Sequence, residues 1–200
     1  MKSMKAILAL AMALLLALGA VSALAEGDTM ENNSMMFPAF EGMDLDGNPV
    51  TSELFKENSV TVVNFWFSTC APCIAELGEL NALNEALKLR GGEVIGINAD
   101  TIGGDEKMIM EAKELLKAKG AMYRNLYFPA DSEVGQLTYN IMAFPTTVVV
   151  DRNGNVVGEP ILGGIDNEAQ MKALQDLIDE TLARDMATLD KDMMMKPDGN

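Results

Sequence analysis

The sequence of 200 residues contains no histidine. Without an imidazole, the chain has no Ser-His-Asp triad, no Cys-His nucleophile pair and none of the usual histidine metal ligands. Cations are also scarce, because 15 lysines and arginines stand against 30 aspartates and glutamates, which gives a formal charge of −15 at pH 7. Nucleic acids and anionic membrane surfaces are bound by clustered cations, so both classes of partner are disfavoured.

The chain has only two cysteines, Cys70 and Cys73, and they form a CxxC pair. A structural zinc site normally needs four cysteine or histidine ligands, and no second pair of such ligands exists. We therefore predict neither a metal site nor a cofactor. The length and the hydrophobic content of 48% predict one packed domain of ordinary size.

Residues 1–25 have the layout of a secretory signal peptide. Two lysines precede an uncharged apolar run from Ala6 to Leu18, and Ala23-Leu24-Ala25 supplies small residues for cleavage. The alternative is an uncleaved anchor, because residues 6–25 are uncharged and a spanning helix needs about 20 residues. Either reading places the domain in the periplasm or on the extracytoplasmic face of the membrane. A dithiol pair there can cycle or persist as a disulfide.

The remaining chain divides into three parts. Residues 26–36 are polar and aperiodic, which predicts a flexible linker, and residues 185–200 predict a polar tail that contains methionines. The domain between them covers residues 37–184. It opens with a predicted β-hairpin around the turn Asp46-Gly47-Asn48, followed by a short helix over Glu53–Lys56 with Ser52 as N-cap.

The cysteines lie between a predicted strand and a predicted helix. Val60–Phe67 is almost continuously apolar, which is typical of a strand buried on both faces. Apolar residues then recur at helical spacing from Ile74 to Leu87, before Gly91-Gly92. With a second buried strand at Val94–Asn98, this order predicts a βαβ unit with the CxxC pair at its first turn.

The rest of the domain alternates between helices and strands. We predict helices over Asp105–Lys119, Ser132–Tyr139 and Asn167 to about Arg184, and strands at Asn125–Phe128, Thr146–Val150 and Val156–Val157.

The position of the CxxC pair predicts its chemistry. At a helix N-terminus, unpaired N–H groups and the helix dipole stabilise a thiolate, which can lower the thiol pKa from ~8.5 into the range ~3.5–7.5. Cys70 is therefore the expected nucleophile, and Cys73 is expected to resolve the mixed disulfide. Ala71 and Pro72 complete the turn, and proline is tolerated there because its missing N–H has no partner in a first helical turn. The alternative is a static disulfide, but so short a loop would stabilise the fold little.

Further residues extend the pattern well beyond the CxxC pair. They are Val62-Val63-Asn64-Phe65-Trp66, Glu76, Tyr139-Asn140-Ile141, Phe144-Pro145-Thr146-Thr147, Val150-Asp151 and Gly154. Together with CAPC they resemble the thioredoxin-like superfamily, and more closely its exported TlpA/ResA-like branch of thiol-disulfide oxidoreductases. The resemblance spans Phe37 to about Leu182. It implies an α/β thioredoxin-like fold, with a central mixed β-sheet flanked by helices and an N-terminal β-hairpin extension.

The resemblance also implies roles for individual residues. Pro145 is expected to be a cis-proline that faces the disulfide and leaves the Phe144 backbone free to pair with an extended substrate. Thr146 and Trp66 join them as candidate substrate contacts, although we expect Trp66 mainly to form core and site wall. Glu76 is the candidate for taking the proton that Cys73 must lose, the alternative being a solvated helix glutamate.

By this resemblance the protein is an exported reductant of protein disulfides and a monomer. A membrane electron donor of the CcdA/DsbD type would supply electrons, and the substrate would be apocytochrome c, another thiol protein or an exported methionine sulfoxide reductase. The opposite direction, disulfide donation to folding proteins, remains an alternative.

Two further alternatives share the fold. A peroxiredoxin-type thiol peroxidase usually carries threonine three residues before its reactive cysteine, but here Phe67 precedes Cys70. Copper proteins of the SCO type normally need a histidine, so Met193–Met195 in the tail is the remaining copper-binding candidate.

Overall fold

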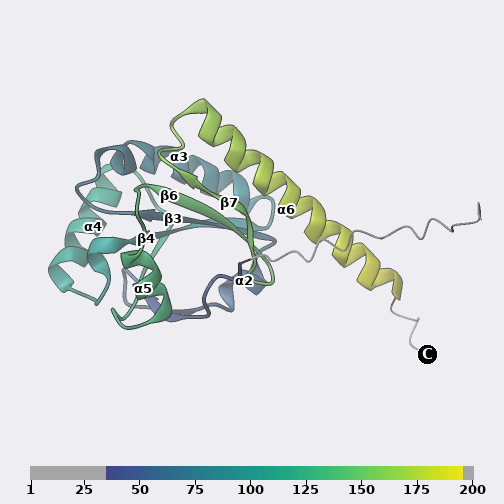
Figure 1. Cartoon of the computed structure of the whole chain (residues 1–200), viewed down its shortest axis with the longest axis horizontal. Coiled ribbons are helices and arrows are strands. Elements are labelled where there is room, and N and C mark those ends of the chain that lie inside the picture. Colours follow the sequence, from purple (N-terminus) through teal and green to yellow (C-terminus); the bar gives the residue numbers. More distant parts are fainter. Residues whose placement is uncertain (1–34, 196–200) are drawn as a thin grey trace, which may run out of the picture. The chain divides into compact units, whose positions relative to one another are not determined.

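A computed structural model describes residues 35–195, which form a seven-stranded mixed sheet with helices on both faces. The sheet order is β2-β1-β5-β4-β3-β6-β7 (Figure 1). The strands are β1 (Glu41–Asp44), β2 (Pro49–Thr51), β3 (Val60–Trp66), β4 (Gly92–Asn98), β5 (Arg124–Tyr127), β6 (Thr146–Asp151) and β7 (Val156–Leu162). The helices are α2 (Leu54–Glu57), α3 (Ala71–Lys88), the 3-10 helix η1 (Ala99–Thr101), α4 (Glu106–Ala118), α5 (Glu133–Tyr139) and α6 (Glu168–Met195).

Strand β3 is an inner strand of the sheet, between β4 and β6, as its apolar sequence predicts. All seven of its residues are buried. It runs parallel to β4 and antiparallel to β6, and β5 in turn runs parallel to β4. The β3-α3-β4 unit is therefore the predicted βαβ unit, and it places the cysteines where the carboxyl end of β3 turns into α3.

Two hydrophobic cores lie on opposite faces of the sheet. One core is covered by α3, α4 and α6, and it contains Trp66 together with both cysteines. The other lies under α2 and α5 and is rich in phenylalanine, with Phe40 edge-on to both Phe55 and Phe128. Figure 1 shows α3 and α6 on one side of the sheet and α2 and α5 on the other. Burial on both faces explains why β3 carries no alternation of polar and apolar residues.

The predicted N-terminal hairpin is present as β1 and β2, joined by the Asp46-Gly47-Asn48 turn. The predicted N-cap of the next helix is wrong, because α2 begins at Leu54 after Glu53, which makes no side-chain cap. The backbone N–H of Ser52 instead donates to the carbonyl of Phe40 at 3.0 Å, which ties this residue to the segment before β1.

Helix α6 extends further than predicted, to Met195 instead of about Arg184. The chain has no glycine or proline between Gly164 and Pro197, so nothing in its sequence stops the helix at Arg184. Residues 185–195 of the predicted polar tail are therefore helical. Among residues 35–195, no helix combines the length and the apolar character that crossing a bilayer would require.

The described chain enters the fold beside the start of the edge strand β7. The carbonyl of Met35 accepts a hydrogen bond from the Val156 N–H at 2.8 Å, and Met36 forms a β-bridge with Asn155. Met35 and Met36, just before the predicted start of the domain at Phe37, thus already pair with the domain. The predicted signal peptide and residues 26–34 of the predicted linker lie outside the described residues.

Candidate active site

Cys70 occupies the N-cap position of α3 and is joined to Cys73 by a disulfide. The Cys70 Sγ accepts a hydrogen bond from the backbone N–H of Cys73 at 3.2 Å. Cys70 is 5% exposed and Cys73 is completely buried, whereas Ala71 and Pro72 between them are exposed. A thiolate on Cys70 would thus lie at the positive end of the helix dipole with an N–H donor already directed at it.

The turn before Cys70 is fixed by the end of the neighbouring strand. The Ser68 N–H donates to the Asp100 carboxylate at 2.8 Å, and the Asn98 amide donates to the Ser68 hydroxyl at 3.1 Å. Asn98 ends β4 and Asp100 lies in η1. Because β3 and β4 are parallel, their carboxyl ends meet at one edge of the sheet, and polar residues there hold the CxxC turn in place.

The peptide bond between Phe144 and Pro145 is cis, as the resemblance implies. The ring of Phe144 packs edge-on against Phe67, with centroids 5.2 Å apart, so the cis-proline segment lies beside the turn that leads to Cys70. The carbonyl of Pro145 accepts a hydrogen bond from the Gly163 N–H at 2.9 Å. Phe144 is half-buried, whereas Pro145 and Thr146 are buried.

Glu76 is completely buried one helical turn after Cys73, on the same face of α3. Its Oε1 accepts from the Asn64 Nδ2 at 2.8 Å, and its Oε2 accepts from the Ile165 N–H at 2.7 Å. The pKa of Glu76 is raised to about 7. Burial is the main cause, the two hydrogen bonds oppose it, and the negative charge of Asp166 adds to the rise. A carboxyl with such a pKa can exchange protons near neutral pH.

Two residues that hold Glu76 were not assigned a role from the sequence. Asn64 lies in the middle of β3 and donates from the same Nδ2 to the Thr147 Oγ1 at 3.0 Å. Ile165 lies in the loop between β7 and α6, 89 residues from Glu76. In the sequence, only Asn64 could have indicated this contact, because it is a polar residue inside the largely apolar run VTVVNFW.

Trp66 is completely buried, and its indole N–H donates to the Asn125 Oδ1 at 2.8 Å. Its side chain is not exposed in this structure, and its expected contact with a substrate stays a prediction. It is a core residue, and Phe67, which is partly exposed, forms the wall of the site.

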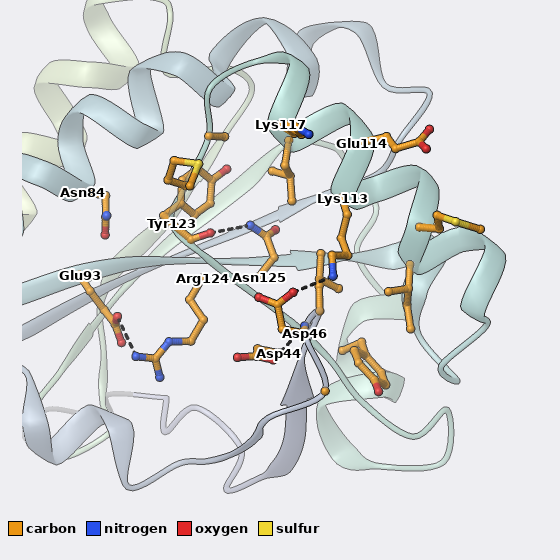
Figure 2. Close-up of a pocket in the computed structure, with 18 of the residues that line it drawn as sticks. Asp44, Asp46, Asn84, Glu93, Lys113, Glu114, Lys117, Tyr123, Arg124 and Asn125 are labelled. Carbon is orange, nitrogen blue, oxygen red and sulfur yellow. Dashed lines mark hydrogen bonds and ion pairs between the residues drawn. The ribbon is translucent and has the colours of Figure 1, made fainter.

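A separate hollow of about 1170 Å³ lies between α4, β5 and the β1–β2 turn. Neither cysteine lines it. Figure 2 shows two ion pairs in it, and their nitrogen–oxygen distances are 2.6 Å for Lys113 with Asp46 and 3.6 Å for Arg124 with Glu93. Across residues 35–195, no group of three or more metal-ligating histidine, cysteine or carboxylate side chains comes together.

Comparison with known proteins points to one family. The sequence model of the AhpC/TSA family matches residues 34–158. Thiol-disulfide oxidoreductase ResA of Bacillus thuringiensis subsp. konkukian is 30% identical over 125 residues, which cover 61% of this chain and 65% of ResA. The thiol:disulfide interchange protein HelX of Rhodobacter capsulatus is 29% identical over 131 residues, 65% of this chain and 67% of HelX. This chain thus spans about two thirds of the length of these curated relatives.

Solved structures confirm the predicted fold. The thioredoxin domain of a thiol-disulfide oxidoreductase from Bacteroides vulgatus superimposes with a TM-score of 0.56 at 25% identity. The match covers 70% of this chain and 96% of that domain. The mixed sheet, its flanking helices and the β1–β2 hairpin are therefore a thioredoxin-like fold.

Proposed function

Because this chain belongs to the AhpC/TSA family and carries a CxxC disulfide at a helix N-terminus, we propose that it is an exported thiol-disulfide oxidoreductase that reduces protein disulfides. The observation that carries this proposal is the placement of three groups. The nearly buried Cys70, the buried Cys73 and the buried carboxyl of Glu76 follow one another on a single turn-and-helix segment. The names of ResA and HelX support thiol-disulfide exchange as the reaction.

The reduced form would act in two steps. The Cys70 thiolate attacks one sulfur of a substrate disulfide, forms a mixed disulfide and releases the other substrate sulfur as a thiolate. Glu76 accepts the proton of the Cys73 thiol, and the Cys73 thiolate attacks the Cys70 Sγ. The second substrate sulfur leaves as a thiolate, so the substrate gains two electrons and the Cys70–Cys73 disulfide forms.

The cis-proline segment would hold the substrate during this exchange. Phe144, Pro145 and Thr146 lie beside the CxxC turn, and an extended substrate segment would pair with the Phe144 backbone. Two hydrogen bonds hold this backbone in position. The Gly163 N–H donates to the Pro145 carbonyl, and the Thr146 hydroxyl donates to the Ala143 carbonyl at 2.8 Å.

The reductive direction follows the ResA-like resemblance. A membrane donor of the CcdA/DsbD type would reduce the Cys70–Cys73 disulfide on the outer side of the membrane. Apocytochrome c, another oxidised thiol protein or an exported methionine sulfoxide reductase would then receive the electrons. The charge of −15 favours a substrate whose docking surface is locally basic.

The reduction potential tests the direction. The purified chain is equilibrated with glutathione or dithiothreitol redox buffers, and the state of Cys70 and Cys73 is determined by mass after alkylation. We expect a potential at or below that of thioredoxin, about −270 mV, whereas a value near −120 mV would identify a disulfide donor and overturn the reductive assignment. The Cys70→Ser variant is the control, and it should not form the mixed disulfide with a model substrate.

A thiol peroxidase is the second candidate, because the matching family is AhpC/TSA. The structure gives Cys70 a different neighbour from the threonine of such enzymes, since Phe67 is packed against Phe144. Consumption of hydrogen peroxide and of an organic hydroperoxide, with dithiothreitol as reductant, separates the two. We expect no turnover above that of the Cys70→Ser variant, and thiol-dependent turnover would favour the peroxidase.

A further inference from the structure

Asn64 is a completely buried polar side chain at the centre of the sheet, and half of its amide is paired. Its Nδ2 donates to the Glu76 Oε1 at 2.8 Å and to the Thr147 Oγ1 at 3.0 Å. Its Oδ1 is buried and accepts no hydrogen bond from any residue in the 35–195 range. An unpaired buried acceptor is costly, so its position beside a titrating carboxyl calls for an explanation.

The observed arrangement fits the ionised form of Glu76. An ionised carboxylate only accepts hydrogen bonds, and here it receives one from the Asn64 amide and one from the Ile165 N–H. Once protonated, the carboxyl must also donate, and neither of these two N–H groups can accept its proton. The amide oxygen of Asn64 is the nearby acceptor that has no other partner.

Rotation of the Asn64 amide by about 180° would bring that acceptor into place, because the rotation exchanges the positions of Nδ2 and Oδ1. The Oδ1 would then lie within hydrogen-bond distance of both Glu76 Oε1 and Thr147 Oγ1. The protonated carboxyl and the threonine hydroxyl can each donate to it, since the hydroxyl turns freely between donor and acceptor roles. The two amide orientations therefore match the two protonation states of Glu76 at one carboxyl position.

We propose that Asn64 is a positioning residue that reverses its amide when Glu76 gains or loses a proton, and so keeps this carboxyl in place beside Cys73. The inference rests on the proposed function, in which Glu76 takes the Cys73 proton. It adds that the backbone N–H of Ile165 fixes one carboxyl oxygen in both states, while Asn64 serves the oxygen that carries the proton.

The other groups that face Glu76 do not replace Asn64. Cys73 precedes it by one turn of α3, and Asp166 in the loop before α6 contributes a like charge. Tyr123, before β5, has a buried hydroxyl whose own pKa is raised by burial first and by the charge of Glu76 second, so it stays neutral. In the region from residue 35 to 195, Glu76 forms no salt bridge with lysine or arginine. The two N–H donors are therefore what favours the carboxylate.

Direct titration of Glu76 in the oxidised protein tests this role without requiring any redox activity. The carboxyl carbon of Glu76 is followed by carbon-13 NMR between pH 4 and 9 in the wild type and in Asn64→Leu. Leucine has a similar volume but can neither donate to the carboxylate nor accept from the carboxylic acid. Because a hydrogen bond to the charged carboxylate is the stronger of the two, its loss costs the ionised form more, and the titration midpoint should rise by at least one pH unit. An unchanged midpoint would overturn the proposal.

Asn84→Leu is the matched control, because Asn84 is a second buried asparagine whose Oδ1 accepts from the Val94 N–H at 3.0 Å. It lines the hollow (Figure 2), which Glu76 does not line, and follows Glu76 by eight residues on α3. Its replacement should lower stability yet move the Glu76 midpoint by less than about 0.3 pH units. An equal shift in both variants would mean that loosened packing, and not Asn64 itself, sets the midpoint.

A measurement on the wild type decides the question even if Asn64→Leu does not fold. The nitrogen-15 shift of the Asn64 side-chain amide should titrate with the Glu76 carboxyl, and its two proton signals should report new partners above and below the midpoint. An amide that shows no titration overturns the inference. If the wild-type protein did not catalyse thiol-disulfide exchange, the proposed function would be contradicted, whereas the linked titration of Asn64 and Glu76 would still be observed.

Discussion

Carboxylates at the hollow and at the cysteine pair have opposite surroundings. At the hollow, Asp46 is exposed and faces Lys113, and Glu93 faces Arg124. Beside the cysteines, Glu76 is completely buried and is held by two neutral N–H donors. The hollow thus contains charges that are already paired. The comparison teaches that, within residues 35–195, the carboxyl beside the cysteines lacks the neighbouring cation that pairs with each of these carboxylates of the hollow.

The pKa values of two carboxyls express the same difference. For Asp44 at the hollow, partial burial alone would raise the pKa, but hydrogen bonds from the side chain and backbone of Asn48 and from the Asp46 N–H lower it below its usual value. For Glu76, burial outweighs the hydrogen bonds and raises the pKa to about 7. The first arrangement stabilises a charge, and the second keeps a proton available.

The largest expected effect is on the pH dependence of stability, measured with Glu76→Gln. The folded pKa of about 7 lies above the ordinary glutamate value of 4.5, so the folded state binds the proton more tightly than the unfolded state does. Stability from this group is complete below pH 4.5 and is lost as pH rises to about 7, a decrease of about 3 kcal/mol. Denaturant unfolding of the oxidised protein should show this decrease in the wild type and not in the variant.

Glu79→Gln is the matched control, since Glu79 is an exposed glutamate on the same helix. It should retain the wild-type slope of stability with pH. If Glu76→Gln also retained that slope, the contrast between the buried and exposed carboxyls would fail.

Gly96→Ala is expected to disturb both regions, because Asn125 lines the hollow and supports Trp66. A Cβ on Gly96 would lie 2.0 Å from the Asn125 Oδ1, the atom that accepts the indole hydrogen bond. Displacing Asn125 leaves a buried N–H unpaired, so we expect a loss of about 2 kcal/mol. Denaturant unfolding measures it, and Trp66 fluorescence reports the change because it is the single tryptophan.

Gly78→Ala provides the comparison for that variant. A Cβ at Gly78 meets no neighbouring atom, and the residue is exposed and lies well inside α3, away from its ends. Alanine there should stabilise the protein by up to about 1 kcal/mol. A similar loss in both variants would show that the Asn125 contact is not the cause.

Tyr123→Phe is expected to raise the free energy of unfolding, by less than Gly96→Ala lowers it. Tyr123 lines the hollow, but its hydroxyl is buried and has no hydrogen-bond partner within residues 35–195. Removing an unpaired buried hydroxyl should stabilise the protein by up to about 1 kcal/mol. The measurement is the midpoint of denaturant unfolding, and a clear loss of stability would show that the hydroxyl has a partner in solution.

Asp46→Asn should have the smallest effect, because its ion pair with Lys113 is largely exposed. The two side chains are 72% and 46% exposed. Exposed pairs contribute little, so the free energy of unfolding should change by less than about 0.5 kcal/mol. A loss of unfolding free energy comparable to that of Gly96→Ala would mean that the ion pair at the hollow stabilises the fold strongly. It would contradict the difference drawn here between the hollow and the buried site.

Local patterns in the sequence predicted the parts of this molecule that depend on neighbours along the chain. The apolar run of β3, the helical spacing of α3 and the turn of the β1–β2 hairpin each confirm this. The end of α6 was misplaced because its sequence changes in polarity at Arg184 but contains no residue that stops a helix. Polarity indicates burial, and it does not by itself end a helix.

The contacts that define the site were harder to predict because they join distant positions. Cys70, Cys73 and Glu76 fall on one segment, so their spacing places them together. The two donors to Glu76 come from 12 residues before it and 89 residues after it, and only the packed sheet brings them there. The burial of Trp66 likewise depends on Asn125, which approaches from another strand.

The entry of the chain at Met35 has a consequence for how this protein can be tethered. Met35 and Met36 pair with the turn between β6 and β7, near the start of β3, whereas the disulfide follows the end of β3. An attachment ahead of residue 35, whether a lipid-embedded leader or a solid support, would therefore join the domain at the pole remote from Cys70. The end of the domain that carries Cys70 is thus opposite to the end where the described chain begins.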